Sequence, residues 1–144
     1  MKHVIRPLPL LGAFVALGAA LVLWRDGSAP WWVVPAGVIG PDLSFLAAIG
    51  AADPGNGLMP SRVVRPYNLV HHPGGPLALA VVSLVVGSPA LLAFPAAWGS
   101  HLLWDRGVGY GMRARDGSIM APRGRTGRGV HPGPSPAPPP ARGA

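Results

Sequence analysis

The sequence predicts an all-α integral membrane protein with four membrane-spanning helices and both termini in the cytoplasm. Of its 144 residues, 49% are hydrophobic and only 12% are charged, whereas soluble domains carry roughly 25% charged residues. Two long stretches, residues 8–23 and 72–104, contain no acidic residue, lysine or arginine. Stretches of this length favour burial in lipid, and four apolar segments of helical length can be recognised along the chain.

The first apolar segment covers residues 8–24 and ends at a polar turn that begins with Arg25. Lys2 and Arg6 precede it, as in the basic region of a signal peptide. The segment is longer than the usual signal core of about 7–15 residues, and the small-x-small sequence that follows, Gly27-Ser28-Ala29, is a poor cleavage site because Pro30 comes directly after it. We therefore expect a retained membrane helix rather than a cleaved leader.

The remaining spans are predicted at residues 31–52, 67–86 and 89–105, with lengths that match a hydrocarbon core about 30 Å thick. The third span contains His72-Pro73-Gly74-Gly75-Pro76. The part from Pro76 to Val86 would be only about 16 Å long. We expect this helix to be kinked or broken, a feature that transporters use to build binding sites.

Orientation follows from the basic residues of the short loops. With an even number of spans, all basic segments fall on one side of the membrane, and the other two loops together hold only Arg25, beside Asp26. The basic segments contain Lys2, Arg6, Arg62, Arg65, Arg106, Arg113 and Arg115. The sequence therefore predicts a multi-pass protein of the cell membrane with its N- and C-termini inside.

Residues 113–144 are rich in arginine, glycine and proline and are predicted to form a disordered cytoplasmic tail. Attraction to anionic lipid and a solvated tail without a specific role both remain open. The net charge of +7 lies largely in this region, without the interleaved aromatic residues that stack nucleic-acid bases, so nucleic acid is not an expected partner. The absence of cysteine excludes disulfides and thiolate metal sites.

Polar side chains are few in the predicted spans, and they fall at similar depths. Counting from the outer interface at 1.5 Å per residue places Asp42 at about 16 Å, His101 at about 18 Å and His71 at about 22 Å. Three different helices thus bring polar groups to the inner half of the bilayer, where a buried carboxylate needs a partner. The predicted cluster consists of Asp42, Asn68, His71, His101 and Asp105, with Arg106 as counter-ion.

Three functions of this cluster remain open. A structural network or a small-ligand pocket needs only hydrogen bonds between helices. A divalent metal such as zinc could be held by His71, His101, Asp105 and Asp42, and would activate water for hydrolysis, although no compact ligand motif is present. Chains of Asp and His also carry protons through membrane proteins, and so small a transporter would require a homo-oligomer. No other cofactor is indicated.

The same residues carry a family resemblance over residues 8–112. The matching motifs are Pro41-Asp42-Leu43-Ser44, Tyr67-Asn68 followed by His71, and His101-x-x-x-Asp105-Arg106-x-x-Gly109-Tyr110-Gly111. In this order and spacing they resemble the bacterial membrane family called domain of unknown function 4260. The resemblance implies several membrane helices and supplies no reaction.

The chain departs from the pattern of that family in three places. Ala47-Ala48 stands where a Gly-Tyr pair usually follows the first motif, and residues 72–75 look like an insertion. The usual ending, with His, Gly and Arg after the Tyr-Gly motif, is replaced by the Arg/Gly/Pro-rich tail. Any ligand that this ending contributes in the family would therefore be missing here.

Overall fold

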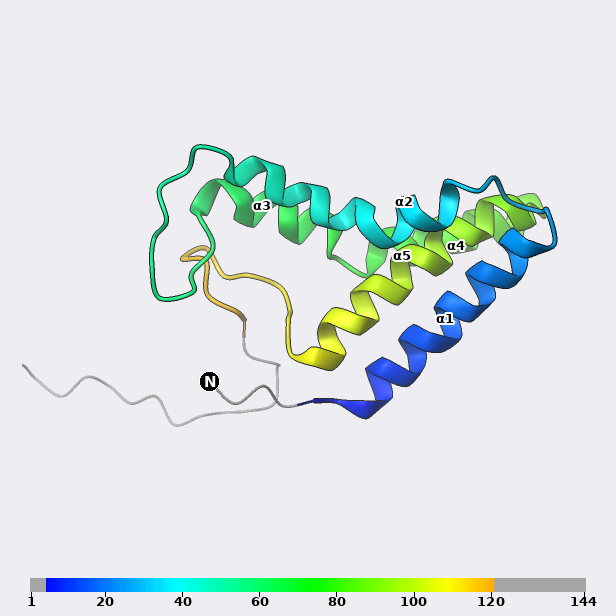
Figure 1. The fold of residues 1–144 in the computed structure, drawn as a ribbon, viewed down its shortest axis with the longest axis horizontal. Helices are drawn as coiled ribbons and strands as arrows, with labels where there is room; N and C mark the ends of the chain where they lie inside the picture. Colours follow the sequence, from blue (N-terminus) through cyan, green and yellow to red (C-terminus); the bar gives the residue numbers. More distant parts are fainter. Residues whose placement is uncertain (1–4, 121–144) are drawn as a thin grey trace, which may run out of the picture.

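The computed structural model describes residues 5–120, which form five α-helices and one 3-10 helix and contain only a single isolated β-bridge (Figure 1). In chain order these are α1 (Pro7–Arg25), α2 (Val33–Ile39), the 3-10 helix η1 (Gly40–Ala48), α3 (Ser61–Val70), α4 (Gly74–Val86) and α5 (Pro89–Val108). The predicted all-α class is confirmed. Helix α5 is central, because it packs against α1, α2, α4 and η1.

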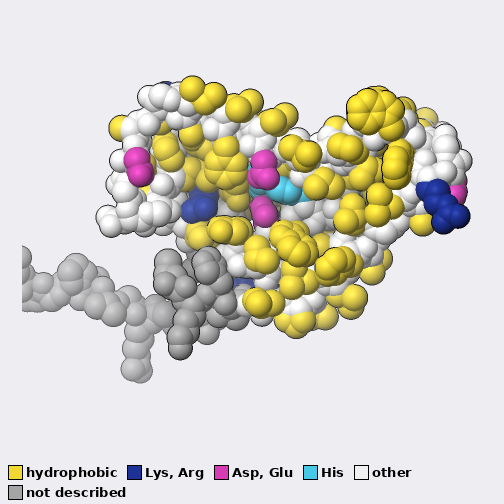
Figure 2. Space-filling model, viewed as in Figure 1, with side chains coloured by type: hydrophobic (Ala, Val, Ile, Leu, Met, Phe, Trp, Pro, Cys, Tyr) yellow, Lys and Arg dark blue, Asp and Glu magenta, His cyan; other side chains and the backbone are white. Residues whose placement is uncertain are grey.

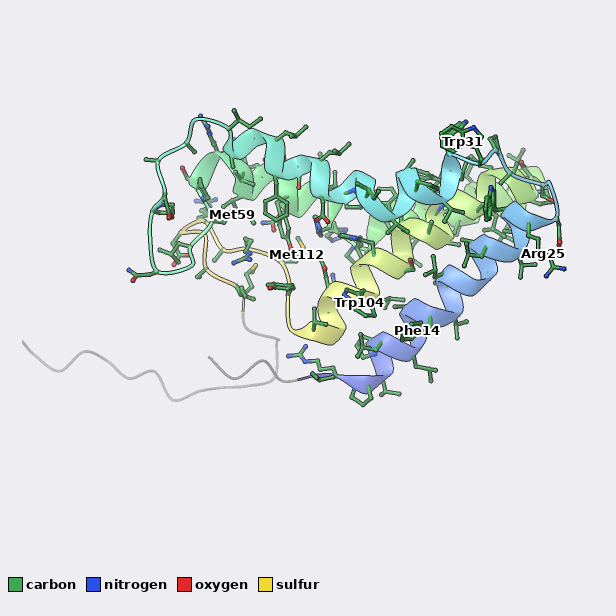
Figure 3. The ribbon with its side chains drawn as sticks, viewed as in Figure 1. Phe14, Arg25, Trp31, Met59, Trp104 and Met112 are labelled. Carbon is green, nitrogen blue, oxygen red and sulfur yellow. The ribbon has the colours of Figure 1, made fainter. Side chains whose placement is uncertain are left out.

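Helices α1 and α5 lie side by side and run in opposite directions (Figure 1). The backbone N–H of Arg6 donates a hydrogen bond to the carbonyl oxygen of Gly107 at 2.8 Å, which joins the start of α1 to the end of α5. A Cβ atom on Gly107 would lie only 2.5 Å from the Leu10 side chain, so this close approach requires glycine. Farther along the pair, the rings of Phe14 and Trp104 meet edge to face, with centroids 5.9 Å apart (Figure 3).

The second predicted span is a continuous helical segment that changes character in the middle. It is α-helical to Ile39 and 3-10 helical from Gly40 to Ala48, four residues short of the predicted end. Pro41 has no N–H group and cannot donate the α-helical hydrogen bond to residue 37, which favours the change of winding. Before the change, Gly37 lets α2 approach α5, because a Cβ atom there would lie 2.6 Å from the Cβ atom of Ala97.

The third predicted span is divided, because α3 ends at Val70 and α4 begins at Gly74. The predicted break is therefore confirmed: the structure interrupts this segment between Val70 and Gly74. Helix α3 begins at Ser61, six residues before the predicted start, because one of its faces is apolar and packs against η1. The residues of this small core are Met59, Val63, Val64 and Tyr67, with Ala47 and Ala48 of η1 against them.

A tight turn joins α4 to α5, in the two residues left between the predicted spans 67–86 and 89–105. Gly87 ends α4 in the left-handed region with a φ of 67°, which glycine adopts without strain. The Ser88 hydroxyl oxygen accepts a hydrogen bond from the backbone N–H of Leu91 at 3.3 Å, and Pro89 occupies the first helical position. The turn therefore sets α4 antiparallel to α5.

The predicted disordered tail begins at residue 113, but the structure shows a defined conformation as far as residue 120. Residues Arg113 and Ile119 form an antiparallel bridge around a turn, and Met59 donates its backbone N–H to the Gly117 carbonyl at 3.1 Å. The Asp116 carboxylate accepts hydrogen bonds from the backbone and hydroxyl of Ser118, which lower the pKa of Asp116. Disorder thus does not describe residues 113–120, and the rest of the predicted tail lies outside the described residues.

Two segments are long and apolar enough to cross a membrane. They are Pro7–Arg25, with a mean hydropathy of 2.0, and Ser61–Val86, with 1.6. Only 11% and 17% of these apolar stretches are buried, so neither is the enclosed core helix of a soluble fold. Figure 2 shows apolar side chains over much of one face. By length and composition these two segments could cross a membrane, and the other two predicted spans do not meet the same criteria of length and hydropathy.

Candidate metal centre

The candidate centre is formed where η1, the end of α3 and the second half of α5 meet. Asp42 lies in the first turn of η1, and His71 directly follows the last residue of α3. His101 and Asp105 lie four residues apart on α5, hence on one face of that helix. In Figure 2, acidic and histidine side chains meet near the middle of the face shown.

Nitrogen and oxygen atoms of these four residues converge on one point. The Nε2 atom of His71 lies 3.9 Å from Asp42 Oδ1 and 3.5 Å from Asp105 Oδ2. The Nε2 atom of His101 lies 3.6 Å from each of the same two oxygens. The two Nε2 atoms are 3.3 Å apart. The ligand atoms of Asp42, His71 and His101 are therefore within reach of one ion, and Asp105 lies beside both histidines.

These separations are close to those of a metal site. Zinc binds imidazole nitrogen and carboxylate oxygen at about 2.0–2.2 Å in tetrahedral geometry, so neighbouring ligand atoms lie about 3.3–3.6 Å apart. The five measured separations range from 3.3 to 3.9 Å. The ligand atoms of Asp42, His71 and His101 all lie within 4.8 Å of one another. Small side-chain movements would bring all of them to metal-bonding distance.

A backbone hydrogen bond orients His71 for this role. Its Nδ1 atom lies 2.9 Å from the carbonyl oxygen of Tyr67, and a carbonyl can only accept. The Nδ1 atom therefore carries the proton, and in neutral His71 the Nε2 atom presents its lone pair to the centre. The Tyr67 ring also stacks on the imidazole, with centroids 3.8 Å apart. Such supporting contacts fix the tautomer and ring orientation of metal-binding histidines.

The centre is rich in electron-pair donors, and no arginine or lysine in the described part of the chain forms an ion pair with its carboxylates. Two carboxylates and the lone pair of His71 face one another. Among the described residues, the ion pairs of Asp42 and Asp105 are all with histidines. Arg106, the predicted counter-ion, makes no ion pair with either carboxylate among the described residues, and its charge acts on Asp105 from a longer distance. A bound cation, or protons shared by the histidines, would supply positive charge at the centre itself.

Exposure differs strongly among the four residues. The side chains of His71 and His101 are 4% and 10% exposed, that of Asp105 is 19% exposed, and that of Asp42 is 52% exposed. The two histidines thus form the closed side of the centre. An ion, a proton or a small ligand would enter past Asp42.

Asn68 lies near the predicted cluster but has another role. Its side-chain amide donates to the Arg113 carbonyl at 2.7 Å, and its oxygen accepts from the Arg113 backbone N–H at 2.8 Å. This two-way contact attaches the chain after α5 to α3. The structure therefore brings Asp42, His71, His101 and Asp105 together and directs Asn68 elsewhere.

Tyr67 and Trp98 support the centre and were not among the predicted site residues. Tyr67 holds His71 by its backbone carbonyl and its ring, and Trp98 donates its indole N–H to the Val70 carbonyl at 2.8 Å. The four-residue spacing of Tyr67 and His71 could have indicated the first contact. The second contact joins residues 28 positions apart, and no local pattern of the sequence indicates it.

Comparison with known protein families gives a match over most of the chain. A family model described as "Domain of unknown function (DUF4260)" matches residues 8–119, which include all four residues of the candidate metal centre. No curated protein and no solved structure matches the chain significantly.

Proposed function

Because this chain belongs to the DUF4260 family, whose description names no reaction, its function has to be inferred from its site, and we propose that it is a membrane protein that binds one divalent transition-metal ion. The ligands are His71, His101, Asp42 and Asp105. Zinc suits this mixture of imidazole and carboxylate groups, and other divalent first-row metals accept the same ligands.

One observation carries the proposal. The Nε2 atoms of His71 and His101 are 3.3 Å apart, and each lies 3.5–3.9 Å from an oxygen of Asp42 and an oxygen of Asp105, without an arginine or lysine in ion-pair contact among the described residues. In a purely structural network, only protons shared among these four groups would satisfy their lone pairs and offset their negative charge. A metal ion satisfies all four groups at once and leaves the imidazoles in the neutral form that metal binding requires.

The exposed side of the centre defines what the metal can do. Because the Asp42 side chain is half exposed, the centre is open on that side, and a fourth or fifth ligand such as water has room to bind an ion there. A metal-bound water loses its proton near neutral pH and becomes a nucleophile for hydrolysis. Metal-dependent hydrolysis at the membrane surface is therefore the activity that we would test once metal binding is established.

For the membrane part of the proposal, we infer four spans with both termini in the cytoplasm. The antiparallel pairing of α1 and α5, with Arg6 bonded to Gly107, puts the basic ends of the two helices on one side. The other end of the molecule carries Arg25 and Trp31 (Figure 3), and Trp31 is 73% exposed. An exposed tryptophan at the end of an apolar helix bundle suits a membrane interface.

The test is the metal content of the purified full-length protein. We expect close to one zinc, iron or manganese ion per chain in the wild type after incubation with the metal and removal of excess. His101→Ala should lose the metal, and His71→Ala should do the same. His72→Ala is the matched control, because His72 is exposed, next to His71 and outside the centre, and it should retain the metal.

Two outcomes would contradict the metal proposal. Wild-type protein that stays free of metal after reconstitution would leave a proton relay or a structural network. Equal metal content in wild type and in folded His101→Ala would place the ion elsewhere. Folding of each variant is checked by helical circular dichroism and by the elution volume in detergent.

A further inference from the structure

Two hollows on the surface are joined at the end of the molecule where α1 begins and α5 ends. The first is an apolar groove of about 340 Å³ between α4 and α5, lined among others by Pro76, Leu77, Leu92 and Leu103. The second is a pocket of about 440 Å³ formed by the start of α1, the α3–α4 break and the chain after α5. Pro73 and Arg106 line both, so the groove continues into the pocket. Both volumes lie in the usual range for ligand sites, about 300–1,000 Å³.

The pocket is basic. Arg6, His72 and Arg106 line it, and no acidic residue is among its described lining residues. Hence we name it the basic pocket. Arginine is suited to phosphate, because its planar guanidinium forms two parallel hydrogen bonds with phosphate oxygens. Arg6 directly precedes α1 and Arg106 lies in the last turn of α5, and the Arg6–Gly107 hydrogen bond holds these two ends together.

His72 adds a directed hydrogen-bond donor. Its Nδ1 atom accepts the backbone N–H of Gly74 at 3.0 Å. Neutral His72 therefore carries its proton on Nε2, where it can be donated to an anion. The three side chains together offer positive charge and N–H groups and suit an oxyanion such as a phosphate.

The groove has the opposite character. Apart from Arg106 at its junction with the basic pocket, the residues that line it are apolar or glycine. A ligand that fills both hollows needs an apolar chain joined to an anionic head. This is the chemistry of a phospholipid.

From this arrangement we propose that the protein binds one anionic phospholipid, with an acyl chain in the groove between α4 and α5 and the phosphate in the basic pocket. The proposal rests on the membrane part of the proposed function and not on the metal. In the orientation inferred above, the basic pocket lies at the cytoplasmic surface, where anionic lipids are concentrated.

The lipid site and the metal centre use consecutive residues. His71 belongs to the centre and His72 to the basic pocket; Asp105 and Arg106 divide in the same way. A cavity of only about 10 Å³ lies between them, lined by His71, Asp105, Arg106 and the chain after α5, and this is about the space of one water molecule. A phosphate in the basic pocket would therefore lie next to the metal centre.

The test is native mass spectrometry of the full-length protein taken from nanodiscs that contain equal amounts of phosphatidylglycerol and phosphatidylcholine. We expect the metal-free wild type to retain one phosphatidylglycerol, with a preference of at least about tenfold, which corresponds to about 1.4 kcal/mol. The double variant Arg6→Gln, Arg106→Gln should lose this preference. Arg25→Gln should keep it, because Arg25 lies at the opposite end of the molecule (Figure 3).

A second pair of variants tests the groove without removing charge. Gly99 lines the groove, and a Cβ atom there would have no atom within 4 Å, so Gly99→Leu can fill the groove without a backbone clash. We expect Gly99→Leu to reduce lipid retention at least about tenfold. Gly18→Leu is the matched control on α1, where a Cβ atom also meets open space, and it should retain lipid as the wild type does.

Three results would overturn the lipid proposal. The first is equal retention of the two lipids by the wild type. The second is unchanged retention in Gly99→Leu. The third is complete displacement of the lipid by millimolar inorganic phosphate, which would show a free-anion site. Failure to enter nanodiscs at all would instead contradict the membrane function, and the metal assay is independent of all these results.

Discussion

The orientation of His71 determines what the candidate centre can bind. The hydrogen bond to Tyr67 places its proton on Nδ1, so the buried Nε2 atom faces the centre as an acceptor. The Nε2 atom of His101 is 3.3 Å away, and both are close to two carboxylate oxygens. One proton on His101 can satisfy only one of these acceptors, whereas one metal ion can satisfy all of them.

A metal bound by two histidines should be released by acid. Each imidazole must be neutral to bind metal. Protons then compete with the metal for both rings, so the affinity should fall as the pH is lowered, by up to about 100-fold per pH unit where both rings take up a proton. Zinc content after dialysis between pH 8 and pH 5 measures this. The His72→Ala control should give the same profile, and zinc that persists unchanged at pH 5 would contradict a two-histidine site.

The sequence located most of the centre, because depth along a predicted span is a matter of simple counting. Asp42, His71, His101 and Asp105 were expected at similar depths, and the structure brings them together. Arg106 and Asn68 were assigned to the same cluster. Their depth agrees, but depth does not give the direction of a side chain: Arg106 lines a separate pocket and Asn68 bonds to the chain after α5.

At the level of the helices, the break between α3 and α4 positions the centre. The break ends α3 at Val70, so His71 lies just beyond the last helical residue. The Val70 carbonyl, left without a helical partner, accepts the indole N–H of Trp98 on α5 at 2.8 Å. The contact joins the two helices that carry His71 and His101.

Trp98→Phe should therefore weaken both the fold and the centre. The Val70 carbonyl would lose its donor in an apolar environment, at a cost of about 1–3 kcal/mol in the free energy of unfolding. Because His71 is the next residue, zinc affinity should also fall. Denaturant titration in detergent and a zinc competition assay measure the two effects. Trp104→Phe is the matched control, since that ring makes an edge contact with Phe14, and an equal loss in both variants would contradict this role of Trp98.

The sequence predicts that helices are present, but it does not predict their winding or their first residues equally well. Hydropathy indicates an apolar segment at residues 31–52 but does not distinguish α from 3-10 winding, which changes at Gly40-Pro41. It also placed Arg62 and Arg65 in a loop. In the structure they lie on the exposed face of α3, because Val63 and Val64 on the other face pack against η1. Such pairings depend on contacts across the fold.

For the molecule as a whole, the number of spans is the prediction that most affects function. Two helical segments have the length and hydropathy of a span, and the proposed topology has four. The two possibilities place Ser61 on different sides. If the α2–η1 segment crosses the membrane, Ser61 lies in the cytoplasm with the N-terminus, and if it does not, Ser61 lies outside with Asp26.

The absence of cysteine makes this question directly testable, because a single introduced cysteine has no background. Asp26→Cys and Ser61→Cys are both at exposed positions. With a membrane-impermeant maleimide, Asp26→Cys should react in intact cells, and Ser61→Cys only after permeabilisation. Labelling of both in intact cells would show that α2 and η1 do not cross. The basic pocket and the metal centre would then no longer be assigned to the cytoplasmic surface, although their local chemistry would be unchanged.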